Sequence, residues 1–410
     1  MNPTPIGPFL GENNRLPDYK LGAGDAGAFV RSAVNVDLTD VGTFQRRSGA
    51  SLAIPGVDCH SLWSGLASSF YVDADVLHRI ELDGETTTVI AAGLPVARRM
   101  AFTDTPVQVC CTNGLDIFRV AGNALVQLGI EPPHMQLSLA VSTGGVMYAG
   151  TYQVAVSFLA LDGEESGASF PVVITVPENG ILTISDIEQR VGFETCVYLS
   201  TANGTDLYRY ARTGLTELVV PVPFLGDGVL CRTLYRTRMP PGQIIACLNG
   251  RLFVAAGNAL YYSEPYALGL HNPAQGYIPF AENITMVEPC QNGLYVSADQ
   301  TYWIDGSVLT ADLNPVLPYR AVFGTSGPVP NKNECFWYSE RGVVVGDQDG
   351  KVKNLQEATV ATSAAVAGAS MFHEHNGLKQ MVASLFGPQQ TVTAASSFMD
   401  AEVIRKETSL

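Results

Sequence analysis

One segment of the chain carries the clearest structural signal: Asn249-Gly250-Arg251-Leu252-Phe253-Val254-Ala255-Ala256-Gly257-Asn258-Ala259-Leu260-Tyr261-Tyr262. It joins a turn pair to a hydrophobic segment, a second pair of turn residues and a second hydrophobic segment. Asn-Gly adopts the positive φ angles of a tight hairpin turn at little cost. The segment therefore predicts two antiparallel strands joined by a short turn.

The same phrase returns along the chain. Its other copies begin at Ser68, Asn113, Asn292, Arg341 and Asn376, the last as the pair Asn376-Gly377. The intervals are 45 residues from Ser68 to Asn113, 43 from Asn249 to Asn292, 49 from Asn292 to Arg341 and 35 from Arg341 to Asn376. Propeller blades run roughly 40 to 50 residues. The sequence therefore predicts an all-β chain that forms a β-propeller of about six blades.

One interval is too long. Asn113 and Asn249 are 136 residues apart, and removing an insertion of about 95 residues would restore a normal blade interval. Between Met135 and Val229 the pattern changes to short strands separated by turns, at 150–158, 172–176, 181–184, 195–200 and 207–210. Strands at this spacing are typical of a small β-sandwich. Together with the turn at Asp162-Gly163-Glu164, the pattern resembles a fibronectin type III or Ig-like domain; the alternative is one oversized blade.

These patterns divide the chain into four parts. We expect an N-terminal arm and first strands in 1–55, the first part of the propeller in 56–134, the inserted sandwich in 135–230 and the second part of the propeller in 231–410. The arm is rich in proline, with Pro3, Pro5, Pro8 and Pro17. It either lies on a neighbouring molecule or forms a terminus without fixed structure.

Composition favours a protein that is part of a larger assembly and does not bind nucleic acid. Only 15% of residues are charged, where about 25% is typical of soluble domains. We therefore expect partners to cover part of the surface. The alternative is that the β architecture alone accounts for the low charge content. The net charge of −15 argues against binding to phosphates, which requires lysine and arginine. An acidic surface suits a conduit that must not adhere to DNA, or it is simply solvated.

The chain carries no secretory signal pattern and no apolar run long enough to span a membrane. Its eight cysteines lack a C-x-x-C spacing, and several lie in apolar strand segments, which indicates free thiols made in a reducing cytoplasm. They are Cys59, Cys110, Cys111, Cys196, Cys231, Cys247, Cys290 and Cys335.

Two motifs could carry chemistry. His373-Glu374-His375 could supply two metal ligands but has no third partner in the sequence, so a solvated loop is the better interpretation. Asp347-Gln348-Asp349-Gly350 resembles a calcium loop without its twelfth-position glutamate and is better explained as a hairpin turn. Nucleophile-elbow, P-loop and dinucleotide motifs are missing. We therefore predict no catalytic, cofactor-binding or metal-binding residues, no cofactor and no enzyme activity.

Three pairs of segments resemble a known family. Residues 31–38 with 42–49 are similar to the opening of tailed-bacteriophage tail proteins, residues 260–266 with 276–280 to one of their blades, and residues 337–346 with 349–355 to another. The resemblance is to the tail nozzle or hub β-propeller of short-tailed, podophage-type phages. It covers most of the chain, although each motif alone is only moderately specific.

The resemblance implies a virion structural protein. In that family a ring of protomers, usually six, continues the DNA channel below the portal and adaptor proteins. The ring retains packaged DNA, lets it exit on infection and carries fibres, a spike or a needle. The protein would be assembled in the bacterial host cytoplasm and act in the virion tail, without binding DNA specifically. The chain is shorter than the best-known nozzles and nearer in length to propellers that plug packaged DNA.

Two other functions remain as alternatives. A carbohydrate-binding or carbohydrate-cleaving receptor-recognition propeller would need a groove lined with exposed aromatic residues, yet Trp63, Trp303 and Trp337 all fall within blade segments. A scaffold propeller that binds peptides would normally keep a more regular repeat than this chain has.

Overall fold

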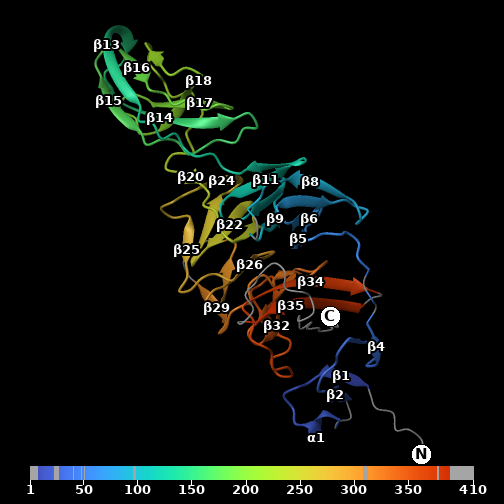
Figure 1. Ribbon diagram of the computed structural model, residues 1–410. Coiled ribbons are helices and arrows are strands. Elements are labelled where there is room, and N and C mark those ends of the chain that lie inside the picture. The colour runs from blue at the N-terminus through green and yellow to red at the C-terminus, as the bar shows by residue number, and fades with distance from the viewer. Residues whose placement is uncertain are drawn as a thin grey trace, which may run out of the picture.

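The chain folds almost entirely into β-strands (Figure 1), in a computed structural model that describes residues 8–22, 27–39, 41–47, 49, 51–95, 98–307, 313–375 and 378–387. The all-β prediction is confirmed. In the described residues the only α-helix is α1 (Asp18–Leu21). That part of the chain holds no helical segment with the length and apolar character that crossing a membrane requires.

Six antiparallel sheets follow one another along the chain. The first contains β5 (Cys59–Ser64), β6 (Ser69–Asp73), β7 (Val76–Ile80) and β8 (Thr87–Ala91), and the second β9 (Ala101–Asp104), β10 (Val109–Thr112), β11 (Ile117–Ala121) and β12 (Ala124–Gln127). The third contains β20 (Thr237–Arg238), β21 (Ile244–Leu248), β22 (Arg251–Ala256), β23 (Ala259–Glu264), β24 (Ala267–His271) and β25 (Tyr277–Pro279).

The last three sheets follow without interruption. The fourth contains β26 (Met286–Cys290), β27 (Gly293–Ser297), β28 (Thr301–Asp305) and β29 (Asn314–Leu317). The fifth contains β30 (Gly327–Pro328), β31 (Glu334–Ser339), β32 (Gly342–Asp347) and β33 (Val352–Asn354). The sixth has two strands, β34 (Ala367–His375) and β35 (Leu378–Phe386).

Each repeated phrase begins between two neighbouring strands of a different sheet. Asn249 and Gly250 have φ of 50° and 72°, the conformation expected of this turn pair. The phrases do not all mark the same hairpin, because Asn113, Asn249 and Arg341 lie between the second and third strands of their sheets in chain order, whereas Ser68 and Asn292 lie between the first and second. Asn376-Gly377 lies outside the described residues, between β34 and β35.

The six sheets stack in sequence, and one edge strand of each sheet contacts an edge strand of the next. β5, β9, β21, β26, β30 and β34 are edge strands of their sheets, and each contacts the next in this order. A separate hydrophobic cluster fills each of the five successive interfaces. Phe253 and Val254 show why: adjacent residues of a strand face opposite sides, and these two enter the clusters shared with the fourth and second sheets, respectively.

The array is propeller-like and open. Within the described residues no hydrophobic cluster joins the sixth sheet to the first. One contact joins distant parts of the array: the guanidinium carbon of Arg99, just before β9, lies 5.0 Å from the ring centroid of Phe323, between the fourth and fifth sheets.

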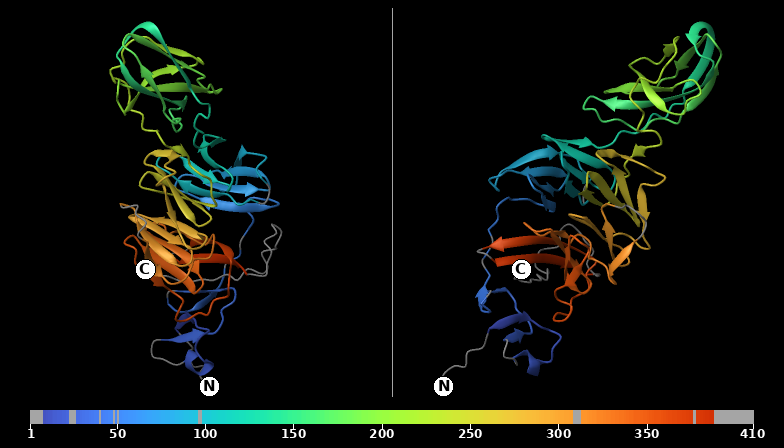
Figure 2. Two further views of the ribbon diagram at one scale, coloured as in Figure 1. Left: turned by 90° about the vertical axis from the view of Figure 1, so that its left-hand side faces the viewer. Right: turned by 180° about the vertical axis from the view of Figure 1, so that it is seen from behind.

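Residues 138–220 form two further sheets at one end of an elongated molecule (Figure 2). One contains β13 (Ser138–Met147), β16 (Gly180–Ser185) and β19 (Leu218–Val220); the other contains β15 (Val172–Val176), β14 (Gly150–Ala160), β17 (Phe193–Ser200) and β18 (Leu207–Thr213). Tyr152, Leu182 and Val197 belong to one core that both sheets share. We call residues 138–220 the two-sheet module. It is not one large blade, because its strands form two separate sheets.

The opposite end holds the N-terminal strands. β1 (Phe9–Glu12) pairs in parallel with β2 (Ala28–Val30), and β3 (Val36–Leu38) pairs with β4 (Phe44–Arg46). Asn14 fastens this part to the segment after the fifth sheet, since its side chain both donates to the Ala361 carbonyl at 3.1 Å and accepts from the Ala361 amide at 2.6 Å. Of the four prolines noted in the arm, Pro3 and Pro5 lie outside the described residues.

Candidate functional site

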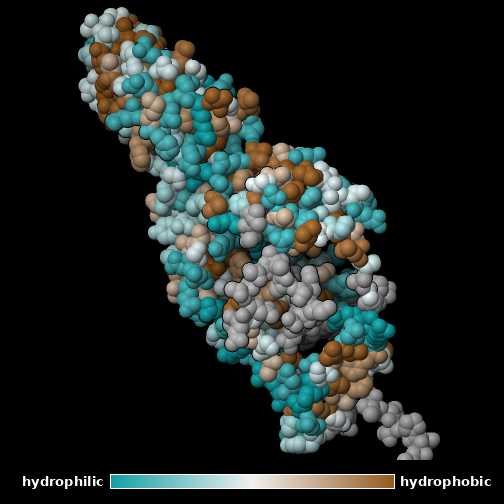
Figure 3. Space-filling model, viewed as in Figure 1, coloured by the Kyte–Doolittle hydropathy of each residue, from teal (hydrophilic) through white to brown (hydrophobic). Residues whose placement is uncertain are grey.

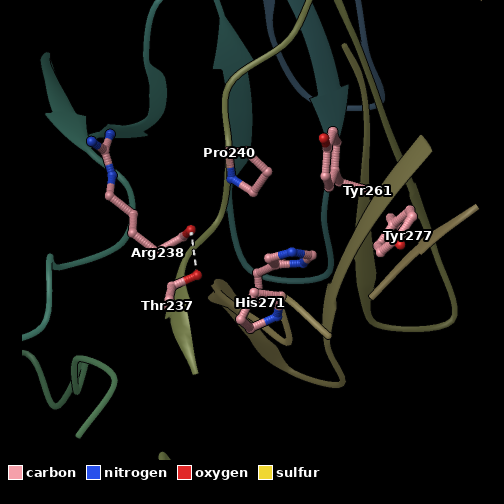
Figure 4. Close-up of a pocket in the computed structure, with 7 residues that line it drawn as sticks. Thr237, Arg238, Pro240, Tyr261, His271 and Tyr277 are labelled. Atoms are coloured by element: carbon pink, nitrogen blue, oxygen red, sulfur yellow. Dashed lines mark hydrogen bonds between the residues drawn. The ribbon is translucent and has the colours of Figure 1, made fainter. Parts of the chain in front are cut away.

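The third sheet carries a groove with an aromatic lining (Figure 4). Its volume is about 270 Å³, and it is lined by Thr237, Arg238, Pro240, Tyr261, His271, Pro273 and Tyr277. These residues come from β20, β23, β24 and β25 and from the segments that connect them. We call this feature the aromatic groove.

Strand register brings its rings together. Tyr261 of β23 is the cross-strand partner of Tyr277 in β25, and their ring centroids are 6.2 Å apart. The His271 ring meets Tyr261 edge-on at 5.5 Å. Within the described structure neither tyrosine hydroxyl makes a hydrogen bond, so both are available to a ligand. Tyr277 is 44% exposed and forms the outer rim.

His271 is a fixed, neutral element of the groove floor. Its Nδ1 donates to the Tyr262 carbonyl at 3.2 Å, and burial lowers its pKa. Because Nδ1 carries the proton, Nε2 is left as an acceptor. Gly276 is required beside it, since a Cβ there would lie 2.7 Å from Nδ1.

Arg238 lines the groove with its stem but directs its charge elsewhere (Figure 4). Its Nε donates to the Leu128 carbonyl at 3.1 Å, and its terminal nitrogens lie 3.2 Å from Asp116 and 3.6 Å from Glu131. Thr237 Oγ1 contacts the Arg238 carbonyl at 3.4 Å. No lining residue is a carboxylate or an amide. The groove can therefore stack an uncharged ring and donate hydroxyl hydrogen bonds, but it holds no acid–base or nucleophile–base pair.

A second polar site joins the two-sheet module to the second sheet. Arg119 of β11 forms a short ion pair with Asp162 and lies 4.0 Å from Glu164. Glu164 also accepts a 2.8 Å hydrogen bond from the Gly129 amide. The pair with Arg119 lowers the pKa of Asp162, whereas burial raises that of Glu164. This cluster orients the module; it has no open ligand position to suggest chemistry.

The motifs singled out from the sequence lie apart from both sites. Glu374 of β34 pairs with Lys379 at 3.8 Å, and within the described residues no group of three metal-capable side chains occurs. His373-Glu374-His375 ends a strand rather than forming a loop, so that expectation was wrong. Asp347–Gly350 forms the turn between β32 and β33, where the Asp347 carboxylate accepts the amides of Asp349 and Lys351, each at 2.9 Å.

The sequence motifs did not reveal the aromatic groove. Its residues are spread over about 40 positions, and only the fold brings them together. Trp303 and Trp337, the obvious aromatic candidates, are buried between the fourth and fifth sheets. The available signal was the recurrence of tyrosine at Tyr261 and Tyr277 near His271.

No protein-family model matches the chain, and no curated protein matches it. Solved structures that align with the chain include dipeptidyl peptidase 4 of Porphyromonas gingivalis, at 12% identity over 81% of this chain and 49% of that chain, with a TM-score of 0.28. BBS1N in complex with ARL6DN matches at 13% identity over 82% and 91% of the two chains, with a TM-score of 0.30. Tricorn protease matches at 13% over 80% and 30%, with a TM-score of 0.24.

This chain spans about half the length of the dipeptidyl peptidase. Identities and TM-scores this low carry no argument about what the chain does. The fold assignment rests on the chain's own sheets.

Proposed function

We propose that this chain is a virion structural protein, a protomer of the tail nozzle or hub ring of a short-tailed bacteriophage. In this proposal the six sheets are the blades of a propeller, the two-sheet module is a fibronectin type III-like insertion, and about six protomers surround a DNA channel below the portal and adaptor. The ring retains packaged DNA, releases it on infection, and carries fibres, a spike or a needle. It is assembled in the host cytoplasm and works in the virion tail.

One observation supports the proposal above the others. The segments that resemble tail proteins occupy three separate parts of the structure: the N-terminal strands, the third sheet and the fifth sheet. The resemblance therefore follows the architecture, not a single local hairpin.

The geometry also limits where DNA would run. Because the Arg99–Phe323 contact joins parts of the sheet array that are not neighbours in sequence, the proposal places the DNA in a lumen between protomers and not within one array. The net charge of −15 suits such a lumen, because acidic walls repel the phosphate backbone and keep DNA from adhering.

Light scattering and negative-stain microscopy of the purified protein, alone and with its tail partners, test the proposal. We expect a ring, or entry into a ring-shaped tail complex. A protein that stays monomeric and joins no tail complex would contradict it.

The second candidate is a carbohydrate-binding or carbohydrate-cleaving receptor-recognition propeller, and the aromatic groove is the observation that favours it. Tyrosine faces can stack on sugar rings, but the groove lacks the carboxylate pair that glycosidic cleavage uses. A glycan array and a polysaccharide-degradation assay decide the matter, since a strong saccharide-dependent signal would reverse the order of the two candidates.

A further inference from the structure

We propose that the aromatic groove binds the proline-rich N-terminal segment, residues 1–8, of a second copy of this chain. The inference rests on the ring proposed above and names a contact that would hold it together. The segment reads Met1-Asn2-Pro3-Thr4-Pro5-Ile6-Gly7-Pro8.

The groove has the chemistry that recognises proline. Grooves for polyproline II segments are lined with aromatic rings, on which proline rings pack, and with side-chain donors for the exposed backbone carbonyls. Tyr261, Tyr277 and His271 supply the rings, and the two tyrosine hydroxyls supply donors that have no other hydrogen bond in the described structure. A volume of about 270 Å³ is smaller than a drug-sized pocket, which suits one or two proline rings and not a large ligand.

The segment has the matching pattern. Pro5 and Pro8 are three residues apart in the sequence, the P-x-x-P spacing that places two prolines on one edge of a bound polyproline II ligand. Residues 1–8 include no charged side chain, and no acid lines the groove. This match matters because two copies that each carry a net charge of −15 repel one another, and an uncharged contact avoids that repulsion.

The position of Pro8 in the fold indicates that the segment in the groove comes from an adjacent protomer and not from the same chain. Pro8 is anchored, since its carbonyl accepts the Ala28 amide at 2.9 Å and the next residue, Phe9, donates its amide to the Gly42 carbonyl at 2.8 Å. In the space-filling view the N-terminal strands and the third sheet lie on different parts of the surface (Figure 3), and in the ribbon view the fourth and fifth sheets lie between them (Figure 1). A segment from an adjacent protomer approaches the groove from outside and need not cross those sheets.

A saccharide is the competing occupant. Sugar sites combine an aromatic face with polar groups that hydrogen-bond to ring hydroxyls, and specific pockets place several such groups together. Here the charge of Arg238 is engaged by Leu128, Asp116 and Glu131, and the lining has no carboxylate or amide. The observations therefore favour the peptide.

The test measures binding of a fluorescein-labelled peptide of residues 1–10 to the full chain. The protein carries Pro3→Ala and Pro5→Ala, so that its own N-terminal segment competes less with the peptide. Fluorescence anisotropy should show saturable binding, weakened at least tenfold by Tyr277→Ala in the protein or by Pro5→Ala in the peptide. Tyr266→Ala is the matched control, because Tyr266 lies just after β23 in the same region, is 83% exposed and does not line the groove.

Three outcomes separate the two proposals. Absence of peptide binding, or equal binding to the Tyr277→Ala and Tyr266→Ala proteins, overturns the inference while ring assembly by light scattering can still stand. Saccharide binding that is lost in Tyr277→Ala, without peptide binding, overturns it in favour of the sugar. Peptide binding by a protein that remains monomeric with its tail partners contradicts both the contact with a second copy and the proposed function.

Discussion

The side-chain hydroxyl of Tyr295, on β27, donates a 2.7 Å hydrogen bond to the backbone carbonyl of Asp347, at the end of β32. This bond ties the fourth sheet to the fifth. Tyr295 is fully buried, and its ring lies 4.6 Å from that of Trp303 and 5.1 Å from that of Trp337. Burial raises its pKa, which keeps the hydroxyl protonated and able to donate. The interface thus combines aromatic packing with a directed polar contact.

Removing that hydroxyl should loosen the interface. Tyr295→Phe keeps the ring but leaves the Asp347 carbonyl without this donor, and we expect the free energy of unfolding to fall by about 1–2 kcal/mol. Urea denaturation measures the change. Tyr266→Phe, at an exposed site, should cost almost nothing. Equal stability of the two variants would show that the bond contributes no net stability.

The junction between the two-sheet module and the sheet array depends on a close backbone approach. A Cβ at Gly269 would lie 2.6 Å from the Gly129 Cα and 2.3 Å from Glu164 Oε1. The carboxylate can move, but the Gly129 backbone cannot. Gly269→Ala should therefore cost on the order of 1–3 kcal/mol and change the angle of the module.

Small-angle scattering and urea denaturation test this expectation. Gly214→Ala is the matched control, because Gly214 has an ordinary φ and no atom within 4 Å of the added Cβ. A scattering profile of Gly269→Ala that superimposes on that of the control would mean that the junction yields without reorienting the module.

Local patterns predicted the hairpins well, because an Asn-Gly pair and its flanking strands are determined by neighbouring residues. Asn249 and Asn292 mark real turns for that reason. The phrases could not show which hairpin of a sheet they mark, since a four-stranded sheet contains three. Nor could they show that the sixth sheet has only β34 and β35 in the described part of the chain.

The aromatic groove depends on register, which the sequence did not provide. Tyr261 and Tyr277 become neighbours only because β25 pairs with β23, and a shift of one residue would turn one ring to the opposite face. The parallel pair of β1 and β2 is non-local in the same way. The expectation of free thiols, in contrast, needed only the absence of a C-x-x-C spacing and the apolar strand segments that hold several of the cysteines.

The cysteines give a prediction about reactivity. All eight are free; Cys59 is exposed, whereas Cys110 and Cys111 are fully buried. Burial raises the pKa of Cys110 to about 12, so almost no thiolate forms at neutral pH. We expect Ellman's reagent to modify Cys59 quickly in the native protein, the half-buried Cys231 and Cys247 more slowly, and all eight thiols after denaturation. Cys59→Ser should remove the fast phase. A fast phase that persists in this variant would show that a second thiol is accessible.

Glu288 should make stability fall as the pH rises. This carboxyl lies on β26, is 9% exposed, and has its pKa raised to about 7 by burial, with a hydrogen bond from Ser326 acting in the opposite direction. A carboxyl whose pKa is higher in the folded state binds its proton more tightly there. Its contribution to the free energy of unfolding is therefore complete below the unfolded pKa of 4.5 and is lost as the pH rises towards 7. A shift of this size corresponds to about 3 kcal/mol.

Glu288→Gln cannot ionise, so its free energy of unfolding relative to the wild type should increase by up to that amount between pH 4.5 and pH 8. Urea denaturation of both proteins measures the difference, in which carboxyls common to both, such as Asp162 with its lowered pKa, cancel. If the free energies of unfolding of the two proteins changed with pH in parallel, the prediction would be contradicted. That result would mean that water reaches the Glu288 carboxyl on β26 and keeps its pKa near the unfolded value.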